Sequence, residues 1–151
     1  MDGIERKLRA DIEQYGWHVL NVLPSDSHPP HSYSIGLFAT FDHPEIVVVG
    51  LPGDTAHHLI NNLAEEIKEG ASFEAGCRYG HVLEGYDVMF VRVAPENYRT
   101  YFGRALDYYG SISFSILQMV WPDRNRFFPW DAGCAEDIRK LQPVLARTLS
   151  S

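Results

Sequence analysis

Cysteine is scarce in this sequence, and long apolar runs are absent. The two cysteines, Cys77 and Cys134, stand far apart, and their spacing matches no metal site or disulfide framework. No apolar run approaches the roughly 20 residues that a helix needs to cross a bilayer. The first residues lack the basic and apolar parts of a signal peptide. We therefore expect a cytoplasmic protein with reduced thiols and no membrane span.

Basic residues are few relative to acidic ones. The chain has 13 Lys and Arg against 20 Asp and Glu, a formal net charge of -7 at pH 7. An acidic surface repels phosphate backbones, so we expect no nucleic-acid partner. The sequence also lacks a Walker loop, a Gly-x-Gly-x-x-Gly fingerprint and a Gly-x-Ser-x-Gly elbow, so no motif indicates nucleotide binding or a serine nucleophile.

Composition and apolar periodicity indicate a folded domain. Hydrophobic residues make up 45% of the 151 residues and charged residues 22%, which is typical of one domain with its own core. Apolar residues three and four apart, bounded by Gly or Pro, predict helices over residues 4–15, 54–69, 95–109 and 135–149, the last broken near Pro143. Alternating or β-branched runs predict strands over residues 17–23, 32–38, 46–49, 78–83, 87–93 and 112–120.

This order of elements predicts a single α+β domain over residues 1–151. We expect a mostly antiparallel or mixed sheet of about five to six strands, flanked by three to four helices. A strand, a turn over residues 39–44, a Val-rich strand and a helix are also similar in order to split barrels that bind flavins. A split-barrel-like arrangement with a flavin cofactor is therefore a further hypothesis, based on analogy alone.

Histidines and carboxylates gather at the ends of two expected strands. The group consists of His28, His31, Asp42, His43 and Glu45. Imidazole and carboxylate suit zinc, iron or manganese, so all of these except Asp42 are candidate ligands of a divalent metal, in a spacing that matches no known signature. His43 and Glu45 are also candidate acid–base groups. Alternatively, Asp42 and His43 bond within the turn and Glu45 pairs with an arginine.

A second group lies in the aromatic loop of residues 121–131. Trp121 and Trp130 are side chains of the kind that stack on flat ligands or anchor protein partners, and Asp123 adds a carboxylate. A loop with this much aromatic surface either folds over the core or serves recognition. In the first case, Asp123 and Asp131 would form turns with the nearby backbone or pair with Arg124.

The other histidines are weaker candidates. His57 and His58 are neighbours in an expected helix, where they point about 100° apart and cannot chelate one ion well. We expect one of them to pack inward and the other to face water. His18 and His81 lie in expected strands and are interpreted as core or sheet-surface residues.

Three short motifs occur in order along the chain: Tyr-Ser-Ile-Gly-Leu at 33–37, His-Pro-Glu at 43–45 and Trp-Pro-Asp at 121–123. With their flanking residues, from about 15 to 131, they resemble an uncharacterised bacterial family, the domain of unknown function 4262. The sequence departs from the family at Arg126 and Phe127, where a glycine is expected in a turn. The resemblance implies a stand-alone bacterial domain and no particular activity.

These observations favour a domain that binds a small polar or aromatic ligand. The pocket would lie between the His31–Glu45 region and the Trp121–Asp131 loop. Its expected contact residues are His31, Tyr33, His43, Glu45, Trp121, Asp123 and Trp130. One alternative is an acidic protein-interaction module of the immunity or antitoxin type, which the net charge of -7 favours. The other is a metal-dependent enzyme with ligands from His28, His31, His43 and Glu45.

Overall fold

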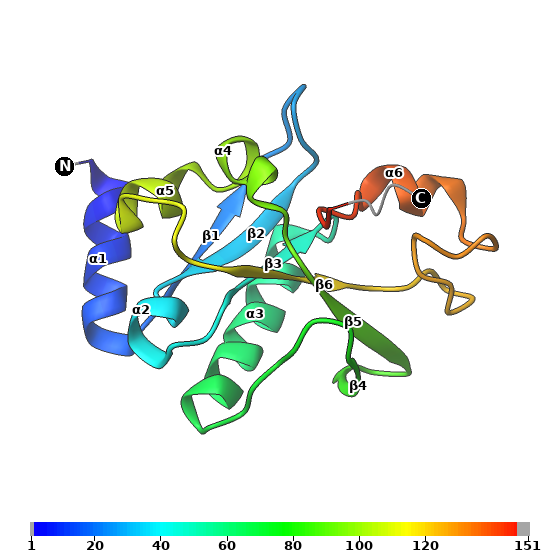
Figure 1. Cartoon of the computed structure of the whole chain (residues 1–151), viewed down its shortest axis with the longest axis horizontal. Helices are drawn as coiled ribbons and strands as arrows, with labels where there is room; N and C mark the ends of the chain where they lie inside the picture. The colour runs from blue at the N-terminus through cyan, green and yellow to red at the C-terminus, as the bar shows by residue number, and fades with distance from the viewer. Residues whose placement is uncertain (1, 148–151) are drawn as a thin grey trace.

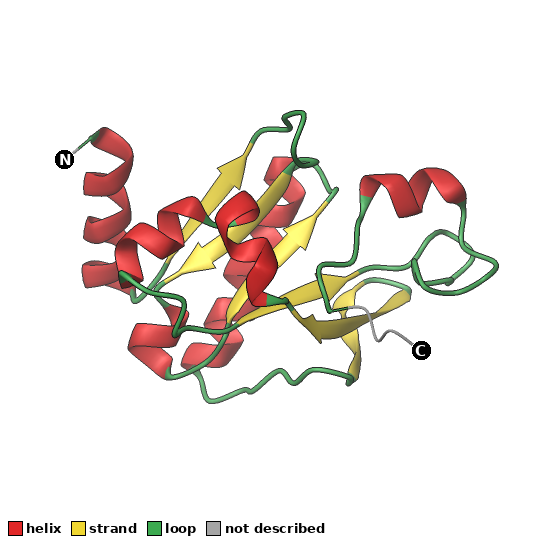
Figure 2. Ribbon diagram, turned by 45° about the horizontal axis from the view of Figure 1, so that its top comes forward, coloured by secondary structure: helices red, strands yellow, loops and turns green. Residues whose placement is uncertain are grey.

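The protein is built on one six-stranded sheet with helices on both faces (Figures 1 and 2). The computed structural model describes residues 2–147. The strands are β1 (His18–Val22), β2 (His31–Ile35), β3 (Glu45–Val49), β4 (Arg78–Leu83), β5 (Tyr86–Arg92) and β6 (Ile116–Val120). The helices are α1 (Gly3–Tyr15), α2 (Leu37–Phe41), α3 (Gly53–Lys68), η1 (Pro95–Asn97), α4 (Tyr98–Tyr101), α5 (Gly103–Tyr109) and α6 (Glu136–Leu141). Within residues 2–147, no helix is long and apolar enough to cross a membrane.

The sheet is mixed and open. Its strand order is β1-β2-β3-β6-β5-β4. The central strands β3 and β6 run parallel, with Glu45 opposite Ile116, and the other neighbouring pairs are antiparallel. The α+β class with a mixed sheet is thus confirmed. The split-barrel-like arrangement is wrong, because β1 and β4 lie at opposite edges of the sheet and do not close it. The analogy that suggested a flavin loses its basis with it.

Helices cover the central strand β3 on both faces. All five of its residues are buried, as its Val-rich sequence predicts. Ile46 and Val48 belong to the core under α3, whereas Val47 and Val49 belong to the core under α1, α4 and α5. Tyr33 of β2 also lies in the second core. Side chains of the two central strands therefore point into packed layers, and open cavities are found toward the edges of the sheet.

Two expected elements differ from the structure: a short helix begins where a turn was expected, and one expected helix is divided into three. The expected turn over residues 39–44 contains most of α2, which Asp42 ends in a left-handed conformation (φ 55). The expected helix over residues 95–109 is divided into η1, α4 and α5. It breaks at Phe102 (φ -130, ψ 40), whose ring is fully buried edge-on against Tyr33, with the ring centroids 5.0 Å apart.

Two further elements are shorter than expected. The strand expected over residues 112–120 begins only at Ile116, because Ser111 and Ser113 bond to each other in a local turn. The helix expected over residues 135–149 ends at Leu141. Pro143 has no N–H and disfavours helix in the preceding residue. Residues 148 and 149 of that expected helix lie outside the described part of the chain.

A close backbone contact joins the corner after α1 to the start of α2. Gly16 and Gly36 both have positive φ, 103 and 118. A Cβ built on Gly36 would lie 2.6 Å from the carbonyl oxygen of Gly16. Thr40 Oγ1 donates to the same carbonyl at 2.7 Å. Position 36 therefore requires glycine both for its backbone conformation and for its packing.

We predict that Gly36→Ala destabilises the fold much more than Gly70→Ala. Gly70 also has positive φ (106), but a Cβ built on it would have no atom within 4 Å. Gly70→Ala should cost about 1 kcal/mol from backbone strain alone, and Gly36→Ala about 3 kcal/mol or more. Urea denaturation of the two variants measures the difference. Equal losses would show that the contact with Gly16 contributes nothing.

Candidate functional site

Glu45 is fully buried and accepts five hydrogen bonds. Ser34 Oγ donates to its carboxylate at 2.7 Å, and Tyr109 Oη donates as well. The amides of residues 36–38 donate at 3.0, 3.1 and 3.1 Å. These amides are the free donors at the start of α2, so the carboxylate of β3 caps this helix.

The surroundings of Glu45 contain donors and no cation. Burial raises the pKa of its carboxyl, and the hydrogen bonds from Tyr109, Ser34 and the amides act in the opposite direction. Glu45 therefore pairs with these neutral groups and not with an arginine, which was the alternative considered from the sequence. Both carboxylate oxygens are engaged, so Glu45 does not present a free acceptor to a ligand.

We predict that Glu45→Gln destabilises the protein by about 3 kcal/mol, because it removes a buried acceptor that several amides share. Either orientation of the new amide places an NH₂ group against a backbone N–H that can only donate. Glu69→Gln, at an exposed position, is the control and should change stability by less than about 0.5 kcal/mol. Chemical denaturation compares the two; a neutral Glu45→Gln would contradict the capping role.

His43 is 5% exposed, and both ring nitrogens have partners. Nδ1 lies 2.8 Å from the carbonyl oxygen of Pro44, and Nε2 accepts from the amide of Phe73 at 3.0 Å. A neutral ring protonated on Nδ1 satisfies both contacts. His43 therefore fastens the segment after α3 to the start of β3. Asp42 is exposed beside it and ends α2.

His28 and His31 come together on the α4 side of the sheet. Their rings lie 4.9 Å apart, edge to face, and both contact Tyr101. His31 is 2% exposed, with Nδ1 3.1 Å from the oxygen of Pro29 and Nε2 2.8 Å from that of Tyr101. Burial lowers the pKa of His31 despite these two carbonyls. Tyr33 is buried and stacks on the His31 ring, 6.0 Å between centroids.

The four candidate metal ligands do not gather. His28 and His31 lie at one end of β2, and Glu45 bonds to residues at its other end. Within residues 2–147, no group of three or more His, Cys, Asp or Glu side chains is placed to hold a metal ion. The geometry thus gives no support for the predicted metal site.

The aromatic loop of residues 121–131 folds around polar anchors. Trp121 is 7% exposed and donates Nε1–H to the carbonyl of Val49 at 2.8 Å. Asp123 Oδ1 accepts from the amides of Asn125 and Phe127, both at 2.9 Å, and its Oδ2 accepts from the amide of Ala135 at 3.0 Å. Asp123 therefore has the turn-forming role that the structural alternative assigns to it.

Acid should weaken this loop. The amides of Ala135 and Phe127 hold the pKa of Asp123 below its usual 3.8. Because the pKa of Asp123 is lower in the folded state than in the unfolded state, its ionised carboxylate stabilises the fold above pH 3.8. This stabilisation is lost as the pH falls through the pKa of the folded state. Asp123→Asn should therefore flatten the loss of stability between about pH 5 and pH 2. Thermal unfolding across this range tests it, with exposed Asp26→Asn expected to leave the profile unchanged.

The two predicted regions line different cavities. Trp130 is 44% exposed and lines a cavity of about 570 Å³ with residues 142–144, 146 and 147. His28 and Tyr33 line another, of about 640 Å³, between β1 and α4. Two tryptophans buried around a cavity would favour ligand binding, and an exposed tryptophan loop would favour a protein partner. Trp121 is buried and Trp130 is not, so their exposure does not decide between the two. The geometry gives no support for one pocket shared by both regions.

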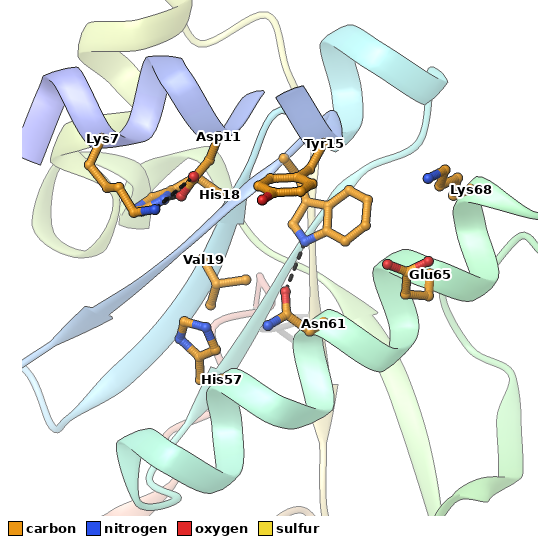
Figure 3. A pocket seen from close by; sticks show the side chains of 10 residues that line it. Lys7, Asp11, Tyr15, His18, Val19, His57, Asn61, Glu65 and Lys68 are labelled. Atoms are coloured by element: carbon orange, nitrogen blue, oxygen red, sulfur yellow. Dashed lines mark hydrogen bonds and ion pairs between the residues drawn. The ribbon is translucent and has the colours of Figure 1, made fainter. Parts of the chain in front are cut away.

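A cavity of about 460 Å³ lies at the edge strand β1, between α1 and α3 (Figure 3). In it, His18 Nδ1 lies 2.6 Å from Asp11 Oδ2, and Lys7 donates to Asp11 Oδ1 at 3.0 Å. The side chains of Asp11 and His18 are 16% and 13% exposed. Burial acts to raise the pKa of Asp11, but the hydrogen bonds from His18 and Lys7 outweigh it and lower the pKa.

His18 lines this cavity, and its second ring nitrogen, Nε2, is not fully buried. No hydrogen bond to Nε2 forms within residues 2–147, although every fully buried polar side-chain atom of this part of the chain has a partner. Nε2 is therefore accessible. On the opposite wall, α3 contributes His57, Asn61, Glu65 and Lys68 (Figure 3). His57 is half-buried and His58 exposed, the division expected from the sequence.

Comparison with known proteins gives one match. The model of the family described as "Domain of unknown function (DUF4262)" matches residues 11–135. The chain belongs to this family. No curated protein and no solved structure matches it. The matched segment of this DUF4262 domain begins at Asp11 and contains His18, Glu45 and the whole aromatic loop.

The sequence does not single out the Asp11–His18 pair. His18 lies in the stretch over residues 15–19 that resembles the family, but Asp11 lies before that stretch. A signal was present in the spacing. Gly16 reverses the chain between α1 and β1, so the first residue of the strand returns beside the last turns of the helix. A polar residue at the start of the strand and a carboxylate two turns back in the helix are then neighbours.

Proposed function

We propose that this DUF4262 domain binds a small polar or aromatic molecule in the cavity between α1, β1 and α3. The observation that carries the proposal is the 2.6 Å contact between Asp11 and His18 at the wall of an accessible cavity. Of the residues that the sequence favoured, His31, His43, Glu45 and Asp123 are buried and bonded to other parts of the fold. The Asp11–His18 pair lines the cavity, and within residues 2–147 the Nε2 atom of His18 has no hydrogen-bond partner.

The pair can act as an acid–base group. Asp11 orients the ring by accepting the Nδ1 proton, which leaves the Nε2 lone pair to take a proton from a bound molecule or from water. The carboxylate stabilises the imidazolium that forms, and Lys7 holds the carboxylate in place. An acid–base pair of this kind fits proton transfer to or from a bound molecule, or activation of a water that attacks it.

The cavity also suits a flat molecule. Tyr15 of α1 is 53% exposed at its rim. Trp17 forms part of the wall, with its Nε1–H donated to Asn61 Oδ1 at 2.9 Å. Glu65 and Lys68 add charges of both signs. An aromatic ring with polar substituents would stack at the rim and reach His18 with one acceptor or donor.

We predict that His18→Ala weakens binding of such a molecule at least tenfold, the effect of losing one buried hydrogen bond to a polar group. Hits from a library of flat heteroaromatic acids and amides, found by ligand-observed NMR, provide the probes. His81→Ala is the matched control, because His81 bonds to Glu66 at 2.8 Å in the same carboxylate–histidine arrangement on an exposed surface.

The control His81→Ala should bind the hits as the parent does. Asp11→Asn should bind them more weakly, and its own unfolding midpoint should stay near that of His81→Ala. Hits that bind His18→Ala undiminished would contradict the proposal.

A basic protein that the domain retains and that Trp130→Ala does not retain would instead favour the alternative of a protein-interaction module. Exposed Trp130 and Phe127 support this alternative. We also propose a cytoplasmic location. Cys77 and Cys134 are free thiols, which supports it.

A further inference from the structure

Two arginines line another cavity, which is mostly polar and lies near the opposite edge of the sheet from His18. This cavity of about 370 Å³ lies between the turn that joins β4 to β5 and residues 122–128. Neither Arg78 nor Arg126 forms an ion pair with a carboxylate within residues 2–147. Two guanidinium groups without a carboxylate partner in one cavity are a local positive site on a chain whose net charge is -7.

Aromatic rings hold both guanidinium groups. Arg78 lies over the ring of Phe128, 4.9 Å from its centroid, and Phe128 in turn stacks on Trp130 at 5.1 Å with the planes 8° apart. Arg126 lies 5.9 Å from the centroid of Tyr86. Within residues 2–147 the only hydrogen bond of these two guanidinium groups is the one from Arg126 Nη2 to the carbonyl of Gly85, so their other N–H groups can donate to a planar or tetrahedral oxyanion.

Arg126 is held in place by its backbone as well. Its φ is 71, a conformation that is costly for a residue with a Cβ, and its Nη2 donates to the carbonyl of Gly85 at 3.2 Å. The glycine expected at this turn from the family resemblance would relieve the strain. The strained arginine instead brings a cation to the wall of the cavity.

The cavity lining also includes the carboxylate of Asp87, which accepts no hydrogen bond within residues 2–147. Asp87 lines it, and a Cβ built on Gly80 would lie 3.1 Å from Asp87 Oδ1. Gly80 and Gly85 add no side chains that would fill the space. A ligand that satisfies this lining carries a negative group for the two arginines and a hydroxyl for Asp87.

We propose that this cavity binds a small polyhydroxy compound that carries an oxyanion, a phosphate monoester or a carboxylate. Arg78 and Arg126 donate to the oxyanion, and Asp87 accepts from a hydroxyl group. Isothermal titration with glucose 6-phosphate, gluconate and glucose tests it. One or both of the charged probes should bind, which identifies the oxyanion, and glucose should not.

Arg78→Gln and Arg126→Gln should each weaken binding of the charged probe about tenfold, the loss expected for one charge-assisted hydrogen bond. The matched control is Arg9→Gln, because Arg9 also lies over a ring, 5.3 Å from the centroid of Tyr108, but on α1. It should bind as the parent does. Circular dichroism checks that each variant is folded, and Arg78→Lys replaces Arg78→Gln if that variant unfolds.

Asp87→Asn should reduce the preference for glucose 6-phosphate or gluconate over inorganic phosphate or acetate, because only the polyhydroxy probes reach Asp87. The proposal is overturned if neither charged probe binds the parent protein at millimolar concentration. It is also overturned if Arg9→Gln lowers affinity as much as the two cavity variants, which would show a general effect of net charge.

Discussion

The buried carboxylate of Glu45 is the interaction on which the centre of the fold depends. An isolated carboxylate is very costly to remove from water, and only hydrogen bonds or charges that replace the water make its burial tolerable. Here the donors come from β2, from the start of α2 and from Tyr109 of α5. One side chain therefore ties two neighbouring strands, a capped helix and a helix of the covering layer into one arrangement.

The same need for partners explains why other polar residues of the interior are hydrogen-bonded to the backbone. His31, His43 and Asp123 are each buried, and each is bonded to backbone groups far along the chain or across a loop. A buried polar group without a partner would cost more free energy than its hydrogen bonds return. In a sheet covered on both faces, polar side chains in the middle are therefore used to hold segments together.

Groups that keep free donors or acceptors lie toward the two edges of the sheet. His18 keeps an accessible Nε2 at β1, and Arg78 and Arg126 keep unpaired N–H groups near β4 and β5. At an edge the helical layer ends, so a side chain can be fixed by one partner and still reach solvent. Asp11 fixes His18 in this way, and the rings of Phe128 and Tyr86 fix the two arginines.

The sequence by itself determined the α+β class, the six strands to within a few residues, the two long helices and the family. These depend on local periodicity and on glycines and prolines whose effects reach only a few residues. It also pointed to Glu45 and Asp123 as unusual, but for a chemical role. Only the tertiary structure decided that these carboxylates serve the fold and that Asp11 and His18 form an accessible pair. The reason is that a polar side chain's role depends on its partner, and partners such as Tyr109 for Glu45 or Tyr101 for His31 are brought close only by the packing of the whole sheet.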